Sequence, residues 1–239
     1  MRNIFRNCGG NTDLRNLFGN GTRSDMKKSG RYKTAHSIED QFEPGSNNQV
    51  LKNKLGITNP DEMDDTEAIA LKEATDNMVR KFDEHHRFTA SDICNFHKIW
   101  LIEIYEWAGK YRQVNVSKED FPFAAAIHIP SLMNQFEHDV LARNTPCNFK
   151  NREEVIHALA ETHIEMVLIH PFREGNGRVA RILSTLMALQ AGLPLLRFDL
   201  IAGEMKKEYF AAIQAGMNKN YQPMEKLLSV IIEKIYVVL

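Results

Sequence analysis

The clearest apolar periodicity in the chain lies on either side of a short glycine-containing segment near residue 175. Between residues 153 and 169, apolar side chains recur at three- and four-residue intervals, which predicts an amphipathic helix. Helical spacing resumes at Val179 and continues to Gly192, a suitable C-cap for a second helix. Pro171 and two glycines interrupt the pattern between them. The sequence therefore predicts a loop held between two helices, with the glycines at the start of the second.

Helical spacing also dominates the rest of the chain from Ile38 onward. We expect a helix from about Asp64 to Phe82, entered through Pro60 to Asp65 with Asp61 or Asp64 as its cap. Further helices are expected over Ile93 to Trp107 with Thr89 or Ser91 as cap, from Pro130 onward, over Ile201 to Met217 with a weak spot at Gly203, and over Met224 to Val238. The aromatic density of the second helix indicates core packing, and we interpret His97 on that face as a core histidine with its hydrogen bonds satisfied.

One segment has strand periodicity instead. Residues Gln113 to Ser117 alternate, Lys118 to Asp120 indicate a turn, and Phe121 to Phe123 form a short return kept at an edge by Pro122. A lone hairpin leaves an unpaired edge that either needs cover or captures another extended chain, and a solvent-exposed hairpin with no partner stays open as an alternative. The predicted fold class is all-α, a helical bundle with one β-hairpin.

Composition narrows the class of protein. With 239 residues, 43% hydrophobic and 26% charged, the chain suits one globular domain with an extension. Residues 1–36 indicate a flexible basic leader, and residues 37–239 the folded domain. A formal net charge of −1 argues against overall attraction to nucleic acid or an anionic membrane, and no run of about 18–20 apolar residues indicates a membrane span.

The three cysteines, Cys8, Cys94 and Cys147, lie far apart and form no C-x-x-C pair. Together with the lack of an apolar signal region, they favour a reducing compartment, and the expected location is the cytoplasm. Delivery into a host cell by a route without a signal peptide stays open as an alternative.

Candidate chemistry gathers in residues 170–181. Gly175 and Gly177 at a helix N-terminus favour an anion-binding nest, because the first helical N–H groups have no internal partner. Arg178 and Arg181 share a helix face and can bind more distant phosphates. Each feature alone is commonly structural: a turn, or a solvated face.

Two further side chains complete this arrangement. Glu174 offers a hard oxygen ligand for Mg²⁺, and His170 at the mouth can take a proton near neutral pH, although a histidine before proline is often only a helix-end residue. A phosphate cradle, a metal-binding carboxylate and a base together predict transfer of a nucleotide-derived group to a hydroxyl.

The twelve residues from His170 to Arg181 match H-x-F-x-[D/E]-G-N-G-R-x-x-R at every specified position, and this pattern resembles the signature of the Fic-domain family. The segment PGSNNQVLKNKLGITNPDEMD resembles the opening of cell-filamentation-type members, and GKYRQVNVSKEDFPFA resembles the family's hairpin, called the flap. The resemblance covers about residues 40–228.

This resemblance implies a protein adenylyltransferase that moves AMP from ATP, with Mg²⁺, to a hydroxyl of a target protein. It implies His170 as base, Glu174 as metal ligand, and Gly175, Asn176 and Gly177 around the α- and β-phosphates, with the Asn176 amide among the contacts. Arg178 and Arg181 would brace the leaving pyrophosphate, and helix position places Tyr209 near the nucleotide base. The flap residues expected to dock the target are Val114, Asn115, Val116, Ser117 and Phe121.

Alternatives within the fold are transfer of UMP, phosphate or phosphocholine; outside it, the alternative is a non-catalytic module that binds peptide or nucleotide. The resemblance also implies inhibition by a glutamate in an [S/T]-x-x-x-E-[G/N] helix that pairs with the second motif arginine. Ser229 to Glu233 comes nearest, but Lys234 follows where glycine or asparagine is expected. We therefore expect a separate small antitoxin chain to supply the glutamate, with Glu233 as the internal alternative.

Overall fold

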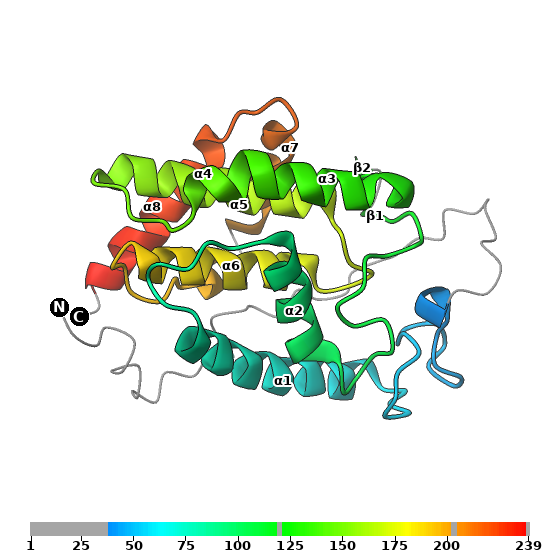
Figure 1. Ribbon diagram of the computed structural model, residues 1–239. Helices are drawn as coiled ribbons and strands as arrows, with labels where there is room; N and C mark the ends of the chain where they lie inside the picture. Colours follow the sequence, from blue (N-terminus) through cyan, green and yellow to red (C-terminus); the bar gives the residue numbers. More distant parts are fainter. Residues whose placement is uncertain (1–37, 119–120, 202–204, 238–239) are drawn as a thin grey trace.

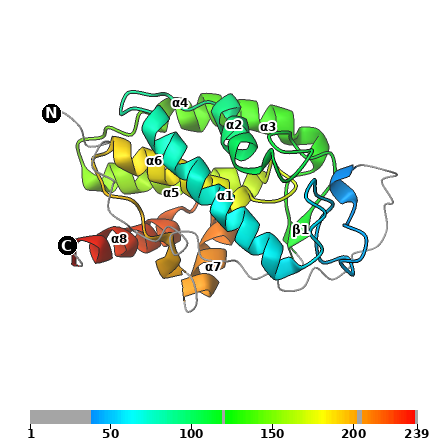
Figure 2. The same ribbon diagram turned by 90° about the horizontal axis from the view of Figure 1, so that it is seen from below.

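The computed structural model describes residues 38–118, 121–201 and 205–237, and the leader expected over residues 1–36 lies outside them. Two helices joined by the motif loop, α5 and α6, pack against each other at the centre (Figure 1). The α1 helix crosses beneath them and packs on α2, while α7 and α8 pack on the other side (Figure 2). The bounds are α1 Pro60–Lys81, α2 Ala90–Leu101, α5 Arg152–Ile169, α6 Asn176–Gln190, α7 Lys206–Gly216 and α8 Gln222–Val237.

The α5 helix, predicted to be amphipathic, is buried over most of its circumference instead. Its inward neighbours include α6, α7 and α8, so that polar residues such as Thr162 and His163 are fully enclosed along with the apolar ones. A helix surrounded by other helices has no solvent face to leave polar. The motif loop is therefore anchored at one end by a helix that is enclosed on most sides.

Side-chain capping explains where α1 and α2 begin. The α1 helix begins at Pro60 and is capped by Asn59, whose side chain accepts from the N–H groups of Asp61 and Glu62, so the predicted caps Asp61 and Asp64 are wrong. Thr89 caps α2 in a reciprocal arrangement with Asp92, as predicted for Thr89.

Other boundaries differ from the prediction. The α2 helix ends at Leu101 and not at Trp107 as predicted. Ile104, Tyr105 and Trp107 are still buried in the turns that follow, so the apolar spacing there reflects burial and not a helix. Likewise α7 begins at Lys206 and not at Ile201, which ends a short 3₁₀ turn, Phe198–Ile201. Gly203 lies outside the described residues.

The end of α6 and the start of the helix predicted from Pro130 follow the prediction closely. Gly192 has a φ of +74° and donates to Leu189 O, while Leu193 N donates to Ala188 O, which is a Schellman C-cap. The helix predicted from Pro130 is a rod made of α3, Ile129–Gln135, a π-helical segment, Phe136–Leu141, and α4, Ala142–Asn144.

The hairpin is shorter than predicted. It pairs β1, Ser117–Lys118, with β2, Phe121–Pro122, in the antiparallel register Ser117 with Pro122 and Lys118 with Phe121. Gln113 to Val116 are irregular and not a strand, because Gln113 N donates to the Glu39 side chain and Val114 O accepts from the Arg112 side chain. The turn residues Glu119 and Asp120 lie outside the described part of the chain. A helical bundle with one hairpin is the predicted fold class, and it is confirmed.

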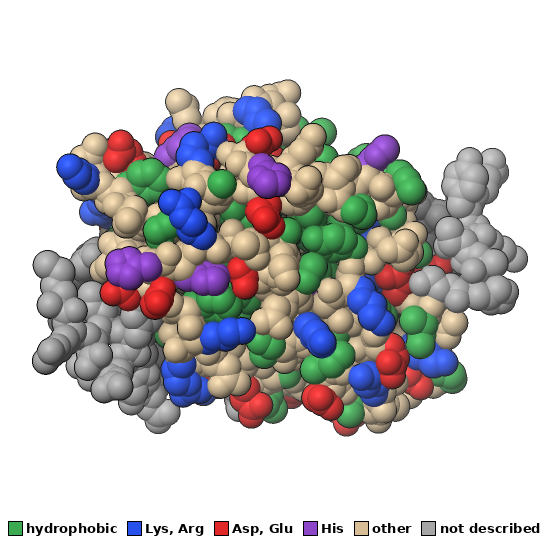
Figure 3. Space-filling view, in the orientation of Figure 1, with side chains coloured by type: hydrophobic (Ala, Val, Ile, Leu, Met, Phe, Trp, Pro, Cys, Tyr) green, Lys and Arg blue, Asp and Glu red, His purple; other side chains and the backbone are tan. Residues whose placement is uncertain are grey.

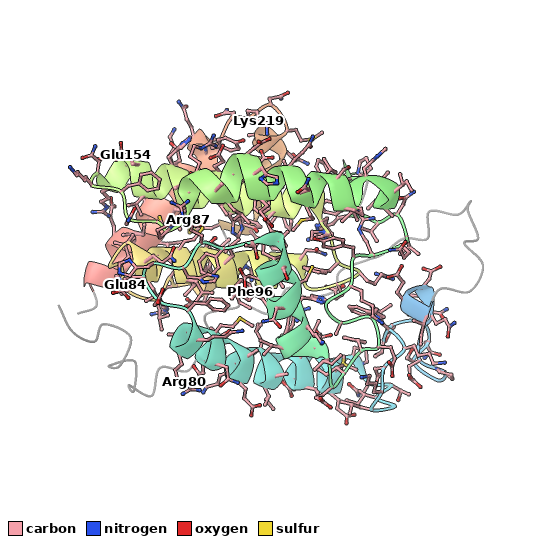
Figure 4. All side chains as sticks on the ribbon, in the orientation of Figure 1. Arg80, Glu84, Arg87, Phe96, Glu154 and Lys219 are labelled. Carbon is pink, nitrogen blue, oxygen red and sulfur yellow. The ribbon has the colours of Figure 1, made fainter. Side chains whose placement is uncertain are left out.

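The surface shows no sorting by charge on the face in Figure 3, where acidic and basic side chains are interspersed. Figure 4 shows Phe96 of α2 inside the bundle, whereas Arg80, Glu154 and Lys219 lie at its rim. None of the helices in the described residues combines the length and apolarity that a membrane span requires.

Candidate active site

The motif loop reverses the chain between α5 and α6 through two left-handed residues. His170 ends α5 with φ +54°, and Gly175 precedes α6 with φ +82°. The side-chain amide of Asn176 closes the loop, accepting from Phe172 N and donating to Phe172 O at 2.8 Å each. The amide oxygen and one amide N–H of Asn176 are thus used inside the loop, and contact of the second amide N–H with a phosphate stays a prediction.

A buried histidine supports the loop from the core side. His97 stacks on Phe172 with ring centroids 4.0 Å apart and lies 3.1 Å from Glu174 O through Nε2. Its Nδ1 accepts from Gly109 N at 2.7 Å, so Nε2 carries the proton and donates to the loop. Burial lowers the pKa of His97 to about 3, which keeps the ring neutral. The interpretation of His97 as a satisfied core histidine is confirmed.

His170 has the tautomer that a general base needs. Its Nδ1 lies 3.0 Å from Val167 O and must donate there, because a carbonyl oxygen can only accept. The lone pair therefore sits on Nε2. Burial lowers the pKa of His170 to about 4, so the imidazole is neutral near pH 7. The ring of Phe123, just after β2, stacks on it at 3.6 Å and joins the hairpin to the base.

The N-terminus of α6 is open beside His170. The first helical bond runs from Val179 N to Gly175 O, so the amides of residues 176–178 have no partner within the helix. A Cβ at Gly175 would lie 2.5 Å from the Trp100 ring, and packing as well as the positive φ demands glycine there. A Cβ at Gly177 would meet nothing within 4 Å, so its absence leaves room for a ligand against the helix end.

Glu174 lies at the edge of this opening with its side chain 29% exposed. Its Oε1 accepts from Gly175 N at 3.1 Å and lies 3.5 Å from Nη2 of Arg178. Within the described ranges no three His, Cys, Asp or Glu side chains gather into a metal cluster. A single carboxylate fits Mg²⁺ bound with phosphates, which takes one or two protein oxygens and completes its shell from phosphate and water.

Arg178 is bound to a buried glutamate that the motif does not contain. Its Nη1 donates to Glu67 Oε2 at 2.7 Å, and Tyr105 donates to the other oxygen of Glu67 at 2.6 Å. Burial by itself would lower the pKa of Arg178, but Glu67 and Glu174 outweigh it and raise the pKa. The guanidinium also lies over the Trp100 ring, 4.5 Å from its centroid. Glu67 of α1 thus balances the charge of Arg178, and the phosphate role of Arg178 stays a prediction.

Glu67 was missed in the sequence, although a signal exists. It occupies an inward position in the apolar row of α1 between Met63 and Leu71, and it is only 1% exposed. Carboxylates at fully buried positions are almost always paired, so a glutamate there indicates a cationic partner.

Arg181 has different surroundings. Its guanidinium carbon lies 6.0 Å from the Tyr209 ring centroid, and its Nε is buried without a hydrogen-bond partner. Tyr209 is itself buried, and its hydroxyl lies 2.8 Å from His163 Nε2. The hydroxyl thus faces the interior of the bundle, and the contact of Tyr209 with a nucleotide base stays a prediction.

Arg112, also missed, ties the hairpin to the base. This fully buried guanidinium donates to His170 O through Nε at 2.7 Å, to Val114 O through Nη1 at 2.6 Å, and to Ala124 O through Nη2. Its backbone N–H donates to Pro171 O at 2.9 Å. Both arms of the hairpin and the turn at His170 therefore share one clamp.

The five predicted flap residues fall into two groups. Val114 is buried, the Asn115 Oδ1 accepts from Ala126 N at 2.8 Å, and Val116 O accepts from Phe123 N at 3.2 Å, so these three shape the hairpin. Ser117 is exposed in β1, and Phe121 in β2 is partly exposed against Phe123. Docking of a target by this hairpin stays a prediction.

Residues 87–188 match the Fic/DOC family. The chain is 26% identical over 161 residues to a probable protein adenylyltransferase of Sinorhizobium fredii, covering 67% of this chain and 81% of that protein. It is 27% identical over 160 residues to the protein adenylyltransferase Fic of Nematostella vectensis, covering 63% of this chain but only 35% of that protein. The N-terminal Fic domain of a VirB-translocated Bep effector protein from Bartonella quintana, with bound ADP, superposes with a TM-score of 0.65 at 27% identity, covering 82% of this chain and 95% of that one. Residues 87–188, which contain the α5–α6 loop and its motif, are therefore a domain of the Fic/DOC family.

Proposed function

We propose that this protein is an adenylyltransferase that moves AMP from ATP to a hydroxyl side chain of a target protein. The observation that carries the proposal is the pairing of a histidine whose Nε2 lone pair is available with the open N-terminus of α6. The adenylyltransferase relatives and the ADP-bound Bartonella domain support it.

In the proposed reaction, the target hydroxyl oxygen attacks the α-phosphorus of ATP while its proton passes to Nε2 of His170. The bond from the α-phosphorus to the oxygen bridging to the β-phosphate breaks, and pyrophosphate leaves with the electron pair. The target retains AMP as a phosphodiester, and His170 later releases the proton. Because His170 is neutral near pH 7, the base is ready without prior deprotonation.

The remaining residues of the loop bind charge. The amides of residues 176–178 point their positive ends at the phosphates, and Arg181 adds a guanidinium for the terminal phosphates. Glu174 would hold Mg²⁺, which when bound neutralises phosphate charge and assists departure of pyrophosphate. Arg178, paired with Glu67, keeps Glu174 and α1 in register with the loop.

The partners follow from the same arrangement. The hairpin, fixed to the base by Phe123 and Arg112, is where we propose that the target segment docks. An inhibitory glutamate would have to reach Arg181, and we propose that a separate small antitoxin chain supplies it, because Glu233 lies exposed on α8 outside a complete motif.

The proposal is tested by His170→Ala, assayed with α-labelled ATP and an extract containing targets. Losing a general base should lower labelling about 10²–10⁴-fold while the affinity for ATP stays within about twofold. His85→Ala, which removes an exposed histidine, is the matched control. Near-normal labelling by His170→Ala would show that another group is the base.

Parallel assays with other labelled nucleotides distinguish the alternative functions. Labelling from UTP in place of ATP would indicate uridylyl transfer, and label from γ-labelled ATP would indicate phosphate transfer. Tight ATP binding with no label on any protein would indicate a non-catalytic binding module.

A further inference from the structure

Beneath Arg181, three helices contribute to a line of hydrogen bonds whose direction is determined. The Ser184 hydroxyl donates to Ala180 O at 2.9 Å, so its oxygen is free to accept from Nδ1–H of His163 at 3.1 Å. That tautomer leaves Nε2 of His163 as an acceptor for the Tyr209 hydroxyl at 2.8 Å. The Tyr209 proton is therefore directed away from Arg181.

The protonation of His163 keeps this direction constant. His163 is fully buried, and burial, reinforced by the nearby charge of Arg181, lowers its pKa to about 3. A neutral ring with its proton on Nδ1 can only accept at Nε2. Hence the lone pairs of Tyr209 stay available to a cation at every pH near neutrality.

Arg181 is that cation. Its guanidinium carbon lies 6.0 Å from the centroid of the Tyr209 ring, and its charge opposes the rise in the pKa of Tyr209 that burial causes. Among the ion pairs of the described residues, Arg178 has carboxylate partners whereas Arg181 has none. A neutral oxygen can orient a guanidinium without cancelling its charge, so the full charge remains for an anionic ligand.

We infer that Tyr209, oriented by His163, is a positioning residue that holds Arg181 for the terminal phosphates of ATP. The inference rests on the proposed function, since it assigns Arg181 to those phosphates. Tyr209 has no contact with the reacting atoms in this role; it acts through Arg181. Its hydroxyl should therefore matter for nucleotides with β- and γ-phosphates and not for AMP.

The test compares the affinities of ATP and AMP, measured by calorimetry, in the wild type and in Tyr209→Phe. This variant keeps the ring and removes only the hydroxyl. Thermal unfolding of the variant checks that it retains the wild-type fold. We expect ATP to bind about tenfold more weakly while AMP stays within about twofold. Tyr221→Phe is the matched control, because Tyr221 is also buried and donates to Glu165 at 2.7 Å on another part of the bundle.

Arg181→Ala and the double variant complete the cycle. Arg181→Ala should weaken ATP binding on the order of a hundredfold. Adding Tyr209→Phe to Arg181→Ala should weaken ATP binding no further, because Tyr209 acts only through Arg181. An equal loss for ATP and AMP in Tyr209→Phe, no loss at all, or additive losses in the double variant would overturn the inference alone. An unchanged ratio of ATP to AMP affinity in Arg181→Ala would overturn the proposed role of Arg181 as well.

Discussion

Two arginines three positions apart on one helix carry different chemistry because of what surrounds each. Arg178 faces the buried carboxylate of Glu67, and its charge is balanced inside the protein. Arg181 lies over the aromatic ring of Tyr209, and its charge is not balanced by an ion pair with any described carboxylate. The spacing predicts a shared face, but the helices packed against that face decide which arginine is paired with a carboxylate.

Glu233 provides a residue-scale prediction about inhibition. We expect Glu233→Ala to change self-labelling with ATP by no more than about twofold, because an exposed side chain contributes little. Alanine is preferred to glycine since it preserves α8. The comparison is made between purified proteins, with Lys234→Ala, the adjacent exposed position, as control. A gain of tenfold or more in Glu233→Ala alone would make Glu233 an internal inhibitor and remove the need for an antitoxin.

At the scale of elements, the hairpin and the α5–α6 loop act as one unit. Arg112 bonds to the carbonyls of His170, Val114 and Ala124, and thus to the turn at His170 and to both arms of the hairpin. Burial lowers the pKa of Arg112 to about 10, which still leaves it charged at neutral pH. The short ladder of β1 and β2 could not position the hairpin alone, because two-stranded pairs are marginal in water.

Replacing Arg112 with lysine should separate the hairpin from the base. Lysine keeps the charge but lacks the planar fork, so it cannot reach three carbonyls together. We expect protein labelling to fall at least about tenfold and the free energy of unfolding to fall by roughly 2–4 kcal/mol, while ATP affinity stays within about twofold.

Arg87→Lys is the matched control, since Arg87 also donates to a carbonyl, Ala142 O at 3.1 Å, but is exposed. Figure 4 shows Arg87 on the loop that leads from α1 to α2. If Arg112→Lys labelled its targets normally, or lost ATP affinity as much as labelling, the clamp would not link hairpin and base as described.

For the whole molecule, three neutral histidines within the bundle link stability to pH. Burial lowers the pKa of His97 and of His163 to about 3 and that of His170 to about 4, against about 6.5 in an unfolded chain. The unfolded state therefore binds more protons below pH 6.5. Stability is fully present above that pH and is lost as the pH falls toward the folded-state pKa values.

Between pH 7.5 and 5.5, each of these histidines should lower the free energy of unfolding by about 1.4 kcal/mol, or up to about 4 kcal/mol together. Urea unfolding at several pH values measures this. His170→Ala should reduce the loss by about a third, whereas His85→Ala, at an exposed position, should leave it unchanged. Constant stability over this pH range would show that the three rings titrate in the folded protein as they do in the unfolded chain.

The sequence by itself determined the features that depend on neighbouring residues. Helical spacing on both sides of residues 170–178 required a loop between two helices, Gly175 and Gly192 supplied the left-handed turns, and Thr89 supplied a cap. These are local requirements of backbone geometry, and a short stretch of sequence contains them. The resemblance of His170 to Arg181 to a family signature is local for the same reason.

Only the tertiary structure decided which distant residues meet. Glu67 and Arg178 are 111 residues apart, Arg112 and His170 are 58 apart, and His163 and Tyr209 are 46 apart. Periodicity can show that such side chains are buried, but not which partner each finds. The same limit applies to the end of α2, where Tyr105 and Trp107 stay in the core after the helix has ended. Packing of separate elements fixes those contacts, because burial in a low-dielectric interior makes each polar group find a partner there.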